Sequence, residues 1–205
     1  MALANLAEWE PLTVPEVAAL FVHCKARWWI AGGWAIDLLL GYQSRSHTDT
    51  DILLLRRDQH SVRQQLRAWD LWAADPPGTL RPWTLGETLP QHVHDIWCRR
   101  SPSEAWSLQL MLDDDDTDDW LFRRDHRVRR SVRSLSGPAS TPERAVLTPA
   151  VQLLYKSREL RSKDEQDFTL TLPVLASSER IWLAEALSIA SPEHPWINRL
   201  SDEAQ

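Results

Sequence analysis

Cysteine is nearly absent from this sequence. The 205 residues contain only Cys24 and Cys98. Two cysteines this far apart form neither a disulfide framework nor a Cys/His zinc cluster, so both kinds of cross-linked small domain are excluded. Chains without disulfides are typical of reducing compartments, and we expect this protein to work in the cytoplasm.

Long apolar runs and a basic leader are also missing. No stretch of about 18 apolar residues occurs, which is the length that a membrane-spanning helix needs. Residues 1–8 contain no Lys or Arg, whereas a secretory signal begins with a positively charged region. We therefore expect neither a membrane span nor an export signal.

Positive charge is in deficit. Lys and Arg total 23 against 29 Asp and Glu, which gives a net charge of −6. Nucleic-acid-binding proteins normally have a basic balance, so we expect no nucleic-acid partner. An acidic protein suits a cationic small molecule at least as well. The length and the 43% of hydrophobic residues fit one medium globular domain, or a domain with a small appendage.

The most informative stretch begins at Trp28. Residues 28–31 are apolar and predict a short buried strand. Gly32 and Gly33 follow, and then a nearly all-apolar segment to Leu40 predicts a buried helix. The backbone of a glycine pair can approach a phosphate closely. The N-terminus of the helix also offers free N–H groups and about half a positive charge to an anion.

Two aspartates mark the point where the next loop becomes a strand. Asp49 and Asp51 come directly before the apolar residues 52–55. Side chains two residues apart on an extended segment point to the same face, and their Cα atoms lie about 7 Å apart. Magnesium prefers a few carboxylates together with phosphate oxygens. A phosphate site next to a metal site is what a nucleoside triphosphate requires.

These features together resemble a known signature. The matching segments are Gly32-Gly33-Trp34-Ala35-Ile36-Asp37 and, after it, Arg45-x-His47-x-Asp49-x-Asp51. They resemble the small nucleotidyltransferases of the polymerase-beta superfamily, and most of all the aminoglycoside and lincosamide nucleotidyltransferase group. The resemblance is dense over residues 28–56 and traceable to about residue 170.

The resemblance implies both a fold and a reaction. The fold is α+β, with a mixed sheet flanked by helices and a helical C-terminal part. The reaction is a metal-dependent adenylyl transfer, in which AMP moves from ATP, or from another nucleoside triphosphate, to a hydroxyl of a small molecule. An aminoglycoside-type antibiotic is the expected acceptor, pyrophosphate is released, and antibiotic resistance is the expected role. Asp49 and Asp51 would bind Mg²⁺, and Gly32 and Gly33 would face the phosphates.

Four further side chains are candidate nucleotide contacts: Arg45, His47, Lys156 and Lys163. The two lysines could neutralise the triphosphate, or they could be ordinary surface lysines. His47 could instead form a hydrogen bond within its loop. Asp37 is the only charge in the apolar helix and needs a partner, and we expect Arg45 to supply it.

A third carboxylate is implied on the following hairpin, as a metal ligand or as the general base for the acceptor hydroxyl. The aligned position falls near Gln109, which cannot do this work. Asp113 lies four residues on, and Asp95 lies on the facing strand. A turn near residue 102 places Asp95 opposite residue 111 or 112, so we expect only one of these two acids to share the face of the aspartate pair.

Asp95 is our preferred third carboxylate, with Asp113 as the alternative. Asp95 lies inside a strand-like segment, where a charge is costly unless it has a function. Asp113 begins an acidic run to Asp119, which predicts a solvated loop. The arginine-rich residues 120–133 predict a solvated face or, alternatively, a lip that attracts the triphosphate.

The remaining pattern divides the chain in two. Ser136–Pro142 has the composition of a linker, and four helices are predicted after it, near residues 148–156, 163–172, 178–189 and 195–200. We predict a nucleotidyltransferase catalytic domain over residues 1–136 and a helical domain over residues 137–205.

Two other functions remain open. The glutamine near the expected carboxylate favours a nucleotide-binding protein of the same fold without catalysis. The other is a toxin-type transferase that acts on RNA or protein.

Overall fold

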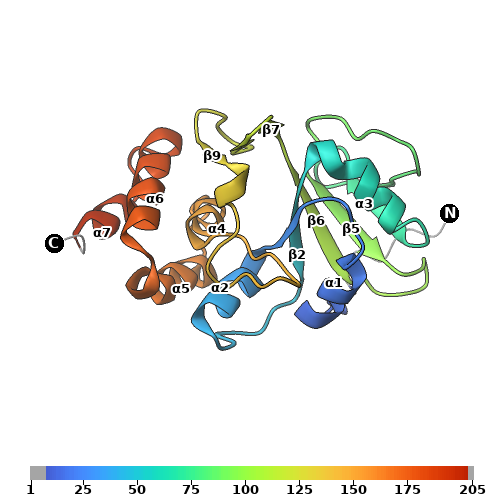
Figure 1. The fold of residues 1–205 in the computed structure, drawn as a ribbon, viewed down its shortest axis with the longest axis horizontal. Helices are drawn as coiled ribbons and strands as arrows, with labels where there is room; N and C mark the ends of the chain where they lie inside the picture. Colours follow the sequence, from blue (N-terminus) through green and yellow to red (C-terminus); the bar gives the residue numbers. More distant parts are fainter. Residues whose placement is uncertain (1–7, 203–205) are drawn as a thin grey trace.

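The computed structural model describes residues 8–202. Residues 1–7, on which the absence of an export signal was predicted, lie outside this range. Figure 1 shows α5, α6 and α7 gathered at one end of the molecule, and α1 and α3 against the sheet at the other. No helix within residues 8–202 is both long and apolar enough to cross a membrane.

The elements in chain order are α1 (Val14–Phe21), β1 (Trp28–Ile30), α2 (Gly32–Leu40), β2 (Asp51–Leu55), η1 (Arg56–Asp58), α3 (Gln59–Gln65), β3 (Asp70–Ala74), β4 (Leu80–Pro82), β5 (Asp95–Arg99), β6 (Leu108–Asp113), β7 (Asp115–Asp116), β8 (Asp119–Leu121), β9 (Arg129–Ser131), η2 (Val132–Ser134), α4 (Pro149–Lys156), α5 (Ser162–Thr171), η3 (Leu172–Val174), α6 (Ser177–Ala190) and α7 (Trp196–Asp202).

A six-stranded mixed sheet organises the fold, with strand order β1-β2-β6-β5-β3-β4. The pair β2–β6 is parallel, and the other neighbouring pairs are antiparallel. Strand β2 is buried along residues 52–55, which explains its unbroken apolar run, since a strand covered on both faces need not alternate. The predicted α+β class with a mixed sheet is confirmed.

The two faces of the sheet pack against different helices. Ile52 and Leu54 point into a core shared with α1 and α3. Leu53 and Leu55 point into a second core with α4 and α6. The helices after residue 136 therefore pack directly on the sheet, which brings their polar residues next to the strand ends that carry the predicted site. The division into domains at residue 136 remains a prediction.

The acidic run is not the solvated loop that its charge predicted. Residues 115–121 form β7 and β8 of a small three-stranded sheet with β9, and Asp113 and Asp114 are buried. Arginines neutralise the run: Arg56 pairs with Asp114 at 2.5 Å, Arg57 with Asp115 at 2.6 Å, and Arg129 with Asp116 at 2.9 Å. Partners that are distant in sequence thus allow these acids to be ordered, which charge density alone does not reveal.

Candidate functional site

A cleft of about 310 Å³ lies between the sheet and helices α4 and α5. Most of the predicted site residues line it: Gly32, Gly33, Arg45, Asp49, Asp51, Asp95, Lys156 and Lys163. His47 and Asp113 are the predicted residues that do not. Segments from residue 32 to residue 164 therefore meet at one place, as expected if they act together.

The glycine pair allows three polar groups to meet at the start of α2. Gly32 has φ +64°, a left-handed conformation that favours glycine. A Cβ atom there would clash with the carboxylate of Asp51, and one on Gly33 would clash with the ring of His47. The Gly32 N–H donates to Oε1 of Gln152 at 2.7 Å, which links this turn to α4.

Asp51 and Asp95 share one face of the sheet. Asp51 pairs with Gln109 on the parallel neighbour β6, and Asp95 pairs with Met111 on the same strand. Residues two apart on β6 point the same way, so both carboxylates project on the side of Gln109. The amide of Gln109 donates to Oδ1 of Asp95 at 3.2 Å, and the Arg123 guanidinium lies 3.4 Å from the same oxygen. These two contacts orient the Asp95 carboxylate.

Asp113 differs from Asp95 in burial, not in the face it occupies. The expectation that only one of them shares the face of Asp51 is wrong, because Asp95 lies opposite Met111, two residues from Asp113. Asp113 is fully buried, and its carboxylate accepts hydrogen bonds from the indole N–H of Trp120 at 2.6 Å and from the hydroxyl of Tyr155. It stabilises the packing beneath the cleft and does not line it.

Negative charge is concentrated at the aspartates. Burial, together with Asp49 and to a smaller extent Asp95, raises the pKa of Asp51 to about 7, while Lys156 and Lys163 act in the opposite direction. A bound cation would therefore stabilise the ionised form of the Asp51 carboxylate. The residues present fit a magnesium ion on Asp49 and Asp51, since this ion needs only one or two carboxylates besides phosphate oxygens and water. Within residues 8–202, no group of three or more His, Cys, Asp or Glu is arranged to hold a metal without such help.

The two predicted lysines have different surroundings. Lys156 is buried, and its Nζ lies 2.7 Å from Asp167 and 3.6 Å from Asp164. Lys163 is exposed at the cleft and forms no ion pair with any residue in the described range 8–202. Lys156 therefore holds α4 and α5 together, whereas Lys163 is available to a ligand.

The partner of Asp37 is His47, and the predicted pairing with Arg45 is wrong. Asp37 accepts hydrogen bonds from the backbone and hydroxyl of Ser44, at 3.1 and 2.5 Å, and pairs with Nε2 of His47. Arg45 instead reaches α5, where its guanidinium lies 3.1 Å from Asp167. The physical reason is reach: both side chains pass over Gly33, but the shorter His47 meets Asp37 on α2, while the longer Arg45 continues to another helix. His47 thus contacts α2 through Nε2 and Arg45 of its own loop through Nδ1, at 3.0 Å, and its predicted contact with the nucleotide stays a prediction.

Several arginines at the cleft were not assigned to the site from the sequence. The basic lining residues are Arg45, Arg123, Arg124, Lys156, Arg158, Arg161 and Lys163, and the acidic ones are Asp49, Asp51, Asp95, Glu159 and Asp164. The lining therefore has an excess of positive charge, although the chain as a whole is acidic. Arg158 and Arg161 lie between the two predicted lysines, and that spacing is the signal that could have identified them.

Comparisons with known proteins match the N-terminal part of the chain most closely. Residues 13–72 match the family model described as aminoglycoside-2''-adenylyltransferase. A lincosamide resistance protein from Staphylococcus haemolyticus is 43% identical over 47 residues. That match covers 23% of this chain and 29% of the relative, so it spans less than a third of the relative's length.

Solved structures match over most of the chain. The lincomycin-bound crystal structure of the lincosamide antibiotic adenylyltransferase LnuA has a TM-score of 0.53 and 19% identity, covering 78% of this chain and 97% of that one. The solution structure of the antibiotic-resistance factor ANT(2'')-Ia has a TM-score of 0.52 and 12% identity, covering 93% and 94%. These matches confirm the predicted fold, including its helical C-terminal part. The family model and the lincosamide resistance protein confirm the resemblance to the aminoglycoside and lincosamide group.

Proposed function

We propose that this chain, which has the nucleotidyltransferase fold, transfers AMP from ATP to a hydroxyl of a small antibiotic and releases pyrophosphate. The observation that carries the proposal is the meeting of Asp49, Asp51 and Asp95 with the Gly32–Gly33 turn in one cleft. Lys163, exposed at the same cleft, supports it because a triphosphate needs a nearby cation. The matching family model supports an adenylyltransferase over other classes that use this fold.

Each group has a place in the reaction. Asp49 and Asp51 would hold Mg²⁺, which when bound offsets the charge that develops on the phosphate oxygens. Asp95 would take the proton from the acceptor hydroxyl, whose oxygen forms a bond to the α-phosphorus. The bond from that phosphorus to pyrophosphate breaks in the same displacement. Lys163 and Arg161 would bind the departing pyrophosphate.

Asp95 is suited to the proton transfer by its two contacts. Gln109 and Arg123 both approach Oδ1, so Oδ2 remains for the acceptor. Asp95 would also serve as the third carboxylate, one strand away from Gln109, which argues against a nucleotide-binding protein without catalysis. The acceptor class is inferred from the names of the matched family and relative, an aminoglycoside adenylyltransferase and a lincosamide resistance protein. Cys24 and Cys98 are free thiols, consistent with a cytoplasmic enzyme that uses cellular ATP.

The test is an acceptor panel with purified protein. Pyrophosphate release would be measured with MgATP plus an aminoglycoside or a lincosamide, to identify the acceptor. The other three nucleoside triphosphates would then replace ATP, to test the preference for the base. EDTA in place of magnesium would test the need for the metal. Mass spectrometry should show an acceptor heavier by one AMP residue. The Asp49→Asn/Asp51→Asn variant is the control and should release none. ATP binding without pyrophosphate release on any acceptor would overturn the proposal in favour of a nucleotide-binding protein.

A further inference from the structure

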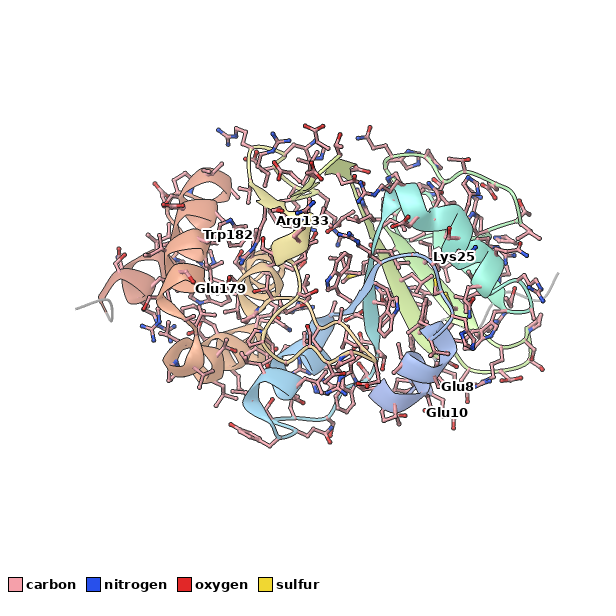
Figure 2. The ribbon with its side chains drawn as sticks, in the orientation of Figure 1. Glu8, Glu10, Lys25, Arg133, Glu179 and Trp182 are labelled. Atoms are coloured by element: carbon pink, nitrogen blue, oxygen red, sulfur yellow. The ribbon has the colours of Figure 1, made fainter. Side chains whose placement is uncertain are left out.

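A second hollow, of about 330 Å³, lies at the opposite end of β1 from the cleft. The cleft begins at Gly32, after β1, whereas the hollow is lined by Trp28 at the start of this strand and by residues from 132–136 and 141–145. The two sites share no lining residue. Figure 2 shows Arg133, one of the lining residues, on η2 near the middle of the molecule.

Three arginines that form no close ion pair line this hollow: Arg27, Arg133 and Arg144. None of them forms an ion pair with a carboxylate of residues 8–202. Their neighbours in the chain behave differently, since Arg129 pairs with Asp116 and Arg130 with Glu179. Unpaired guanidinium groups gathered in one hollow leave an excess of positive charge there.

Arg144 is the least satisfied of the three. Its Nε is buried and has no hydrogen-bond partner among the described residues. A buried donor without an acceptor loses its water without compensation, so a ligand oxygen placed there would be favourable. The only acid in the lining, Glu143, is held by the Thr141 hydroxyl and by backbone in its own turn. Its charge attracts Arg144, but it gives the Arg144 Nε no hydrogen bond, so the acceptor is still missing.

The rest of the lining suits a small ligand with an oxyanion at one end. Trp28 is half-buried and packs on Phe21 with a centroid separation of 5.3 Å, so it forms a firm apolar wall. The Ser136 hydroxyl accepts from the indole N–H of Trp29 at 3.0 Å and keeps its own hydrogen for a ligand. Guanidinium groups bind phosphate oxygens through paired, charge-assisted hydrogen bonds.

We propose that this hollow is a second binding site, which takes a phosphate-bearing small molecule on Arg27, Arg133 and Arg144. The site goes beyond the proposed transfer reaction, because none of its residues lines the catalytic cleft. It is nevertheless connected to the cleft through the backbone. Ile30 of β1 bonds to Ala145 and Leu147 at 2.9 and 2.8 Å, and the two joined segments continue into Gly32 and into α4.

The test is isothermal titration calorimetry with inorganic pyrophosphate in EDTA, so that binding does not depend on magnesium. The main variant is Arg27→Ala/Arg133→Ala, since both side chains are exposed and their removal should leave the fold intact. Because the cleft can also bind pyrophosphate at Arg161 and Lys163, this variant is made in an Arg161→Ala/Lys163→Ala background. There we expect it to weaken the remaining pyrophosphate binding about tenfold or more, the loss typical of one or two charge-assisted hydrogen bonds. Arg144→Ala, with circular dichroism as the check on folding, should weaken it similarly.

Two matched variants remove the same number of cations elsewhere. Lys25→Ala/Arg67→Ala alters another basic hollow beside α3, and Figure 2 shows Lys25 well apart from Arg133. Arg161→Ala/Lys163→Ala alters the cleft. Lys25→Ala/Arg67→Ala should leave all pyrophosphate binding unchanged. Arg161→Ala/Lys163→Ala should remove the binding that the cleft contributes and leave the event at the hollow with its wild-type affinity. The proposal is overturned if wild-type protein gives no heat at millimolar pyrophosphate, if Arg27→Ala/Arg133→Ala does not weaken binding in the Arg161→Ala/Lys163→Ala background, or if either matched variant abolishes all binding. None of these outcomes depends on adenylyl transfer.

Discussion

Replacing Lys156 and Lys163 by methionine should separate a structural lysine from a ligand-binding one. Lys156 is buried against Asp164 and Asp167, which are themselves buried. Removing one partner of a buried ion pair costs about 3–5 kcal/mol, because a charge is left without compensation. Part of the compensation remains after the change, because Arg161 still contacts Asp164 at 2.7 Å and Arg45 still contacts Asp167 at 3.1 Å. We therefore expect Lys156→Met to lower the free energy of unfolding by about 3 kcal/mol, the low end of that range.

Lys163→Met should leave the stability of the protein unchanged and weaken its use of MgATP. The Lys163 side chain is exposed and has no ion pair within the described residues, so the stability change should stay within about 0.5 kcal/mol. The KM for MgATP should rise instead, since the cleft loses a cation. Urea unfolding followed by tryptophan fluorescence measures the first quantity. For a chain of this length, about 3 kcal/mol corresponds to a fall in Tm of about 6–12 °C. Wild-type stability of Lys156→Met, or equal destabilisation by both substitutions, would refute this division of roles.

Four other expectations follow from the cleft. Asp49→Asn/Asp51→Asn should abolish transfer without lowering the Tm of the free protein, because burial and the neighbouring carboxylates already oppose ionisation of Asp51. Measurable turnover would count against the metal site. MgATP should raise the Tm in a concentration-dependent way by mass action, as a thermal shift assay would record. Asp95→Ala should lose turnover but keep the wild-type Tm. Asp113→Ala should instead lower the Tm, because it leaves the Trp120 and Tyr155 donors unpaired. The reverse pattern would assign the role of general base to Asp113. Gly32→Ala should destabilise by about 2–4 kcal/mol, from a positive φ and a clash with Asp51, and circular dichroism melting would test it.

Local signals in the sequence predicted the elements around the cleft well. The strand at Trp28–Ile30, the helix up to Leu40 and the strand Asp51–Leu55 follow from apolar runs that are bounded by glycines and turn-forming residues. The hairpin register was predictable to within one residue, since a turn near residue 102 places Asp95 opposite residue 111 or 112, and the structure has Met111 there. That one residue decides the face of a side chain, so the relation between Asp95 and Asp113 was not predicted correctly. These features depend on residues that are close together in the sequence, so the sequence alone is enough to predict them.

Contacts between distant segments were not predictable in the same way. Arg45 was expected to pair with Asp37, eight residues away, but it reaches Asp167, more than a hundred residues away. Lys156 is a predicted phosphate ligand and lines the cleft, but no local pattern indicated that the packing of α5 places two acids beside it. A charged residue shows that a partner is needed, but the choice among distant partners depends on how helices pack, which no local pattern specifies.

Those distant contacts explain how the loop before β2 can hold its aspartates in place. Loops are usually the more mobile parts of a fold, yet Asp49 would need a fixed position to bind a metal. His47, two residues before it, is anchored to α2 through Asp37, and Arg45 anchors the same loop to Asp167 on α5. Asp51, two residues after it, begins β2 and is hydrogen-bonded into the sheet through its carbonyl to Ala31 at 2.9 Å. The loop is thus fixed on both sides of Asp49, so the buried ion pairs contribute to positioning the site even where none of them touches a ligand.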